Sequence, residues 1–155
     1  MQFGIRLHDA VQAPVEERLK IVKEQGFTCA HVALSKVISE NSVAPEALTP
    51  GYAMYLRRLF DKYELDCAVL GCYLNLATPD AAQLKAAQEK YMANIRFAAH
   101  LGAGVVGTET GAPNVEYKFE EACWNEESLQ IFIRNLRPVV KYAEQMGGLV
   151  AIEPV

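Results

Sequence analysis

The residues best placed to do chemistry are polar side chains at the ends of short apolar runs. Glu153 stands out, because it directly follows the run Leu149–Ile152 and precedes a proline. A charge at the mouth of a buried strand is costly unless it is paired or bound to a cation, and hard divalent cations take carboxylate oxygens. A carboxylate there can also remove a proton next to a carbonyl. Glu153 is therefore a candidate metal ligand and a candidate catalytic base.

Polar residues also stand at or near the ends of the other four apolar runs. Alternate residues of a strand share a face, and parallel α/β folds bind ligands beyond the carboxyl ends of their strands. The candidates for such a rim are His8, His31, Ser35, Tyr73, Asn75, Glu109 and Glu153. We predict substrate-binding roles for four of them: His8, Tyr73, Asn75 and Glu109. His31 lies deeper in its run, which favours a satisfied core histidine.

Nine elements must position these residues. Apolar runs predict strands over Gln2–His8, Thr28–Leu34, Asp66–Leu74, Gly104–Thr108 and Leu149–Ile152. Helical periodicity predicts helices over Val15–Gln25, Gly51–Tyr63, Ala81–His100 and Asn125–Gln145. Continuous apolar strands that alternate with amphipathic helices indicate a parallel sheet covered by helices, which is an α/β fold.

Two α/β architectures are open at this point. The length of 155 residues suits a five-stranded, flavodoxin-like open parallel sheet, whereas a (β/α)8 barrel takes about 250 residues. An open sheet of that type normally ends with a helix after its fifth strand, and none is predicted here. The first turn, His8–Pro14, also has neither the glycine nor the Ser/Thr of a phosphate loop. The stretch Gly102–Gly107 reads GxGxxG, but it follows a helix and enters a strand, the reverse of a dinucleotide-binding turn.

The composition excludes several classes of protein. The chain is 51% hydrophobic and 22% charged, which excludes a disordered protein. A net charge of −4 without a Lys/Arg block opposes nucleic-acid binding. No run approaches the roughly 18 apolar residues of a membrane span, and the first residues show no signal-peptide pattern. We expect a cytoplasmic protein with no membrane or nucleic-acid partner, and its four cysteines as reduced thiols, mostly in the core.

Four segments together resemble one known family. They are Met1–Ile5, the helix Glu17–Gly26 with Phe27 after it, Leu101–Ala103 and Ala151–Pro154. They look like the sugar phosphate isomerase/epimerase family, xylose isomerase-like barrels that include ketose 3-epimerases, inosose dehydratases and apurinic endonuclease relatives. The resemblance runs along the whole chain and implies a (β/α)8 TIM barrel.

The resemblance also implies a divalent metal, which is Mn, Mg, Co or Zn. The family holds it with Glu, Asp, His and Glu from the later strands. Glu153 matches the first of these ligands, which in the epimerases also serves as the proton-transfer base. The other three lie on strands beyond the fifth, so this chain alone is expected to hold no metal tightly.

We therefore expect residues 1–155 to form one xylose isomerase-like domain, a partial barrel of strands one to five with four helices, truncated after the fifth strand. The complete barrel would be a sugar isomerase or epimerase that acts on a small carbohydrate or sugar phosphate by metal-assisted proton transfer. The alternatives are an inosose dehydratase-like lyase and a catalytically inert fragment or assembly module. An arc with open strand edges and an apolar inner face should associate, most simply as a homodimer.

Overall fold

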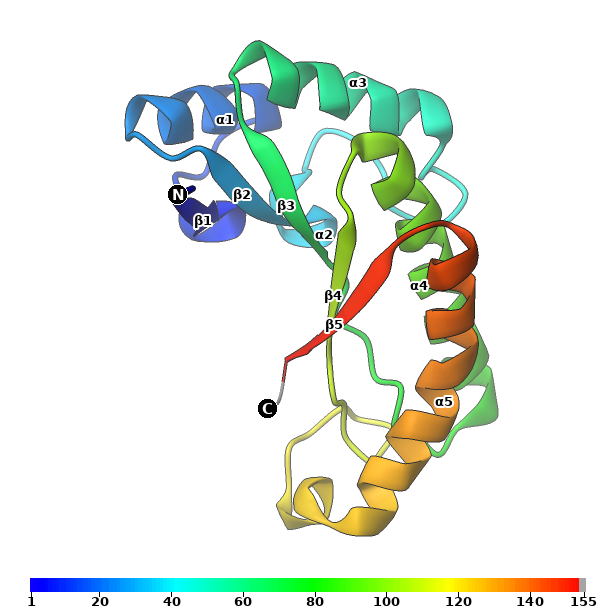
Figure 1. Ribbon diagram of the computed structural model, residues 1–155. Helices are drawn as coiled ribbons and strands as arrows, with labels where there is room; N and C mark the ends of the chain where they lie inside the picture. Colours follow the sequence, from blue (N-terminus) through cyan, green and yellow to red (C-terminus); the bar gives the residue numbers. More distant parts are fainter. Residues whose placement is uncertain (154–155) are drawn as a thin grey trace.

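Five parallel strands lie side by side in the order of the sequence (Figure 1). This computed structural model describes residues 1–153. The strands are β1 (Gly4–Arg6), β2 (Cys29–Ala33), β3 (Asp66–Gly71), β4 (Val105–Glu109) and β5 (Leu149–Glu153). A flavodoxin-like sheet has the order 2-1-3-4-5, so that alternative is wrong. Consecutive parallel neighbours are the arrangement of a (β/α) barrel, and the partial-barrel prediction is confirmed.

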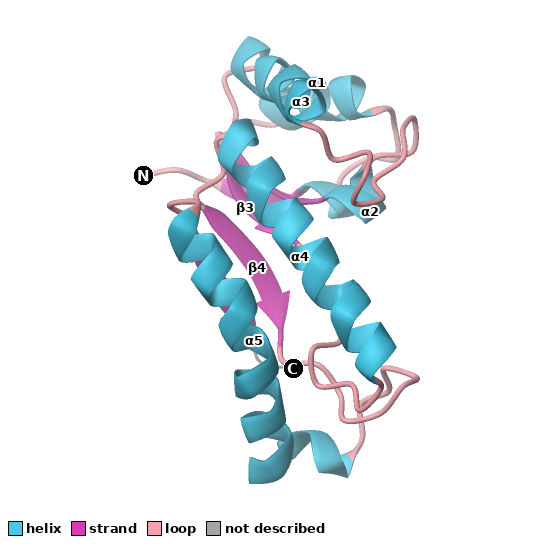
Figure 2. Ribbon diagram, turned by 90° about the vertical axis from the view of Figure 1, so that its right-hand side faces the viewer, coloured by secondary structure: helices cyan, strands magenta, loops and turns pink. Residues whose placement is uncertain are grey.

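Four long helices lie on one side of this sheet. They are α1 (Val15–Glu24), α3 (Pro50–Lys62), α4 (Ala81–Leu101) and α5 (Glu126–Gln145), which confirms the four predicted helices. Figure 2 shows α4 and α5 running across β3 and β4. The opposite face carries no helix within residues 1–153 (Figures 1 and 2).

The helix ends follow local sequence signals. The side chains of Thr49, Asp80 and Asn125 each accept a hydrogen bond from a backbone N–H three residues on, at 3.2, 2.7 and 2.8 Å. Such caps satisfy donors that the first helical turn leaves free. Gly102 ends α4 with φ +93°, a left-handed conformation that favours glycine. These signals fix the lengths of the helices that support the strand ends.

The core lies between the sheet and the long helices. Its largest fully buried side chains include Tyr91, Phe97, Phe132, Leu19, Leu56 and Leu70. All four cysteines are free and three of them are buried, as expected; Cys123 lies partly exposed on a short 3₁₀ helix, η2 (Glu121–Trp124). No helix within the described range is both long and apolar enough to cross a membrane.

Three predicted strands end earlier than expected because the chain turns at the carboxyl edge. β1 stops at Arg6, and Leu7–Asp9 form a 3₁₀ helix, η1. Buried Arg18 donates to the carbonyl of Leu7 at 3.0 Å and holds this turn. β2 ends at Ala33, where the short helix α2 (Leu34–Val37) begins. β3 ends at Gly71, and beyond it the backbone N–H of Leu74 donates to the hydroxyl of Tyr91 on α4 at 3.1 Å.

Candidate functional site

A polar pocket of about 280 Å³ lies at the carboxyl ends of the strands. Each strand contributes to it directly or through the residues that follow it. The lining residues are Arg6, His31, Lys36, Tyr73, Glu109 and Glu153. Three of the predicted site residues, Tyr73, Glu109 and Glu153, are therefore brought together. Of the other three, His31 was a rim candidate that we expected in the core, and Arg6 and Lys36 were not among the predicted site residues.

Two carboxylates end neighbouring strands. Glu109 on β4 and Glu153 on β5 are register partners, so both side chains leave the same face at the same height. The hydroxyl of Tyr117, from the loop after β4, donates to Glu109 Oε1. Burial, and then this bond to the Glu109 carboxylate, raise the pKa of Tyr117. Glu153 is exposed and accepts no hydrogen bond from residues 1–153, so its carboxylate is open to a ligand or a proton.

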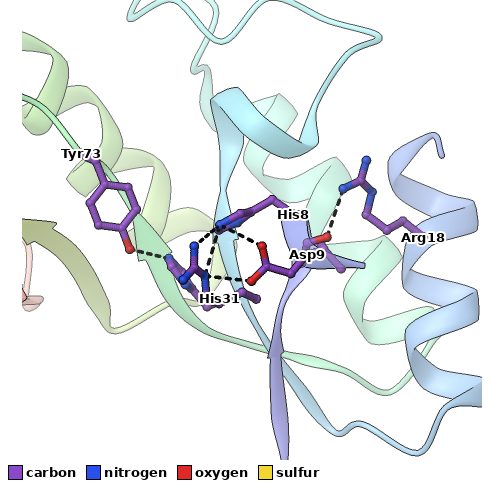
Figure 3. Close-up of polar contacts among 7 residues, drawn as sticks. His8, Asp9, Arg18, His31 and Tyr73 are labelled. Carbon is purple, nitrogen blue, oxygen red and sulfur yellow. Dashed lines mark hydrogen bonds and ion pairs between the residues drawn. The ribbon is translucent and has the colours of Figure 1, made fainter. Parts of the chain in front are cut away.

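A histidine and a tyrosine form the middle of the pocket. His31 Nε2 and the Tyr73 hydroxyl are 3.0 Å apart, and the two rings meet edge to face with centroids 5.9 Å apart (Figure 3). Gly71 makes room for this pair, because a Cβ atom there would overlap His31 Nε2 and lie 2.9 Å from Tyr73 Cε2. His31 is thus hydrogen-bonded, as a satisfied histidine should be, and it also lines the pocket.

His8 lies behind this pair, on η1, and does not itself line the pocket. Its side chain is 8% exposed, and its ring meets that of His31 edge to face at 5.7 Å (Figure 3). His8 Nε2 accepts from Arg6 Nη2 at 2.8 Å. Burial and the positive charge of Arg6 lower the pKa of His8. Burial, His8 and Arg6 likewise lower the pKa of His31, against an opposing effect of Glu153. Both rings are therefore neutral at pH 7.

Asn75 lies outside the pocket lining, and its amide is engaged by backbone groups. Its Oδ1 accepts from the N–H of Ala77 at 3.1 Å and of Ala112 at 3.0 Å. Its Nδ2 donates to the carbonyl of Asn114 at 2.8 Å. Asn75 thus ties the loop after β3 to the loop after β4. Ser35 lies on α2 rather than at a strand end, and it is also outside this pocket.

The sequence did not lead us to the two cations of the pocket, Arg6 and Lys36, and it favoured a core position for His31 rather than a place in the pocket lining. Alternation along the first strand does put Arg6 on the face shared with Gly4 and His8, so a signal for Arg6 existed. Lys36 lies on α2, a helix of four residues that has no clear periodicity. Nothing in the sequence pattern places its ammonium group over the pocket.

The described residues do not make a complete metal site. Within residues 1–153, no group of three or more His, Cys, Asp or Glu side chains could hold a metal ion. Divalent cations such as Mg²⁺ need a full shell of oxygen ligands, about six. Glu109 and Glu153 offer two carboxylates, of which Glu109 already accepts from Tyr117. These two carboxylates fit part of the ligand set of a metal site and leave its other ligands to residues outside this pocket.

Known structures share this fold over almost the whole chain. A D-psicose 3-epimerase from Clostridium cellulolyticum H10, solved with D-tagatose, matches with a TM-score of 0.70 and 17% identity over 97% of this chain and 51% of its own. A D-tagatose 3-epimerase-like protein matches with a TM-score of 0.68 and 23% identity over 98% and 52%. A xylose isomerase domain protein from Planctomyces limnophilus matches with a TM-score of 0.64 and 13% identity over 96% and 50%. The chain thus spans about half the length of these proteins.

Comparison at the level of sequence identifies the family. No curated protein matches the sequence. The family profile described as xylose isomerase-like TIM barrel matches residues 19–155, which is most of the chain and includes every strand from β2 onward. This match agrees with the strand order and with the structural neighbours. The chain belongs to the xylose isomerase-like TIM barrel family.

Proposed function

We propose that this pocket is part of a sugar isomerase or epimerase, which moves a proton on a small carbohydrate in a barrel completed by further strands. The observation that carries the proposal is the Glu153 carboxylate, open at the end of β5 and flanked by hydrogen-bonding groups. Structural neighbours described as a D-psicose 3-epimerase and a D-tagatose 3-epimerase-like protein support it.

Glu153 is the proposed base. A carboxylate can take the proton from a carbinol carbon next to the ketose carbonyl, which leaves an enediolate. Return of a proton to the opposite face of the same carbon inverts that carbon and gives an epimer. When the proton is taken from C1 instead, its return to C2, with the C1 hydroxyl proton passing to the C2 oxygen, gives an aldose. In either case the atoms of the sugar are conserved.

The other lining residues hold the sugar. The Tyr73 hydroxyl and neutral His31 can each donate to or accept from a sugar hydroxyl, and the free oxygen of Glu109 can accept from one. A pocket of about 280 Å³ is close to the lower limit of about 300 Å³ for small-molecule sites, which suits a monosaccharide. A divalent cation, with Glu153 as one ligand and further strands supplying the rest, would polarise the carbonyl.

The test uses the full-length protein and the variant Glu153→Gln, with a ketose incubated in D₂O. We expect the wild-type protein to exchange deuterium into the carbon next to the carbonyl. The variant should lose roughly 10²–10⁴-fold of that rate, the range for general base catalysis. Glu144→Gln on the outer helix α5 is the matched control, because Glu144 is exposed and remote from the pocket. Undiminished exchange in Glu153→Gln would refute the assignment, and loss of water from the sugar would favour a lyase.

A further inference from the structure

The pocket has a cationic end opposite its carboxylate end. We propose that Arg6 and Lys36 form a subsite for an anionic group on the substrate, a phosphate or a carboxylate. The inference rests on the proposed function, because it specifies which sugars the same pocket takes.

The two cations flank the central His31–Tyr73 pair. Arg6 on β1 is the register partner of His31 on β2, so the two side chains leave the sheet next to each other. Lys36 Nζ lies 5.6 Å from the centre of the Tyr73 ring, whose hydroxyl reaches His31. The cations thus come from β1 and α2, whereas Glu109 and Glu153 end β4 and β5. Between β1 and β4 lie β2 and β3, which carry or precede the central residues His31 and Tyr73.

Arg6 has donors left for a ligand. A guanidinium carries five N–H donors. Among the described residues, Arg6 uses Nε and Nη2 toward His8 and pairs Nε with Asp9 at 3.2 Å, while its Nη1 makes no hydrogen bond. The Arg6–Asp9 pair is 56% exposed on both sides, and exposed ion pairs contribute little stability. An anion in the pocket can therefore compete with Asp9 for this cation.

Lys36 has no carboxylate partner within residues 1–153. Its contact with the Tyr73 ring leaves all three ammonium donors available for hydrogen bonds. A flexible lysine beside a guanidinium suits a phosphate or carboxylate, because charge-assisted hydrogen bonds to such groups are about twice as strong as neutral ones.

The polarity of the pocket also sets the orientation of the substrate. Glu109 and Glu153 repel an anion at their end, whereas Arg6 and Lys36 attract it at theirs. A sugar with one terminal anion therefore binds with that terminus toward β1 and its reacting carbons toward Glu153. A neutral sugar has no such electrostatic preference, so the arrangement selects for anionic sugars.

The experiment measures equilibrium binding to the full-length protein by titration calorimetry. The probes are D-fructose, D-fructose 6-phosphate and the 6-carboxylate analogue, D-fructuronate, which share a chain and differ at one terminus. We expect at least one anionic probe to bind about 10-fold or more tightly than D-fructose, since hydrogen bonds to charged groups each contribute enough for such a ratio. The anionic probe that binds more tightly shows whether the subsite takes a phosphate or a carboxylate. The preference should shrink as salt is raised.

Two variants remove the cations separately. Lys36→Met keeps a long side chain on the exposed face of α2, and Arg6→Gln keeps an N–H donor for His8. Each should lower the anionic-to-neutral affinity ratio by about 10-fold. Lys85→Met on α4 is the matched control, because Lys85 is an exposed lysine whose one ion-pair partner within residues 1–153 is Glu89, and it should keep the wild-type ratio.

Two results would overturn the subsite: equal affinity for neutral and anionic probes, or a preference that survives in both variants. Both results come from binding measurements that require no turnover, so they are independent of the deuterium-exchange test of Glu153→Gln. An anion preference that follows Arg6 and Lys36 in a protein where Glu153 proves dispensable would keep the subsite and remove the proposed reaction.

Discussion

At the scale of single residues, His8 and His31 make stability depend on pH. Both pKa values are lowered in the folded protein, chiefly by burial, with Arg6 acting in the same direction. In the unfolded chain a histidine has a pKa of about 6.5. As the pH falls, each of these histidines therefore binds a proton in the unfolded chain before it does so in the folded protein. The free energy of unfolding should therefore fall as the pH drops below about 6.5, until the lowered pKa values of the folded state are reached.

The measurement is the urea midpoint at pH 7.5 and at pH 5.5, for the wild type and for His8→Gln. We expect the wild-type midpoint to fall in acid and the variant to lose part of that fall, because glutamine does not titrate. His100→Gln provides the control, since His100 is exposed at the end of α4 and its removal should leave the pH dependence in place. Identical pH dependence in wild type and His8→Gln would contradict the argument.

At the scale of elements, β2 and β3 can present His31 and Tyr73 together because Gly71 has no side chain. Gly71→Ala would place a methyl group against both rings, and overpacking of this kind costs about 1–3 kcal/mol. Gly104→Ala is the matched control, because a Cβ atom at Gly104 meets nothing within 4 Å. Urea unfolding of both variants gives the comparison. A Gly71→Ala protein as stable as Gly104→Ala would show that the His31–Tyr73 pair moves aside freely.

The same elements show how far sequence reasoning reaches. Long periodic helices and continuous apolar strands are local patterns, so the four long helices, the five strands and their parallel arrangement could be predicted. The residues after the strands could not, because tertiary contacts decide them. The hydrogen bond from Arg18 to Leu7 turns His8 out of β1, and the unpredicted helix α2 carries Lys36. The carboxylate side of the pocket was therefore predictable, and alternation along β1 also put Arg6 on the face shared with Gly4 and His8, but the position of Lys36 was not predictable.

At the scale of the whole molecule, the helices cover one face of the sheet and leave the other open (Figures 1 and 2). Within residues 1–153, β1 and β5 each pair with one neighbour. Large apolar side chains near these two edges are exposed, including Phe3 at 59% and Leu149 at 68%. Matched structures are about twice as long as this chain, so the fold has room for further strands against both edges.

A protein that presents only these five strands is expected to associate, because unpaired strand edges and exposed apolar surface favour pairing with another copy. Light scattering on residues 1–155 should give a mass of at least twice the 17.1 kDa of one chain. Leu149→Lys should shift the protein toward monomer. Leu149 lies on the same face of β5 as Glu153, and a lysine there would repel the same lysine of a second copy. Val140→Lys changes an exposed valine on the outer helix α5 and should leave the mass unchanged. A stable wild-type monomer at micromolar concentration would mean that the chain satisfies its open edges without a partner.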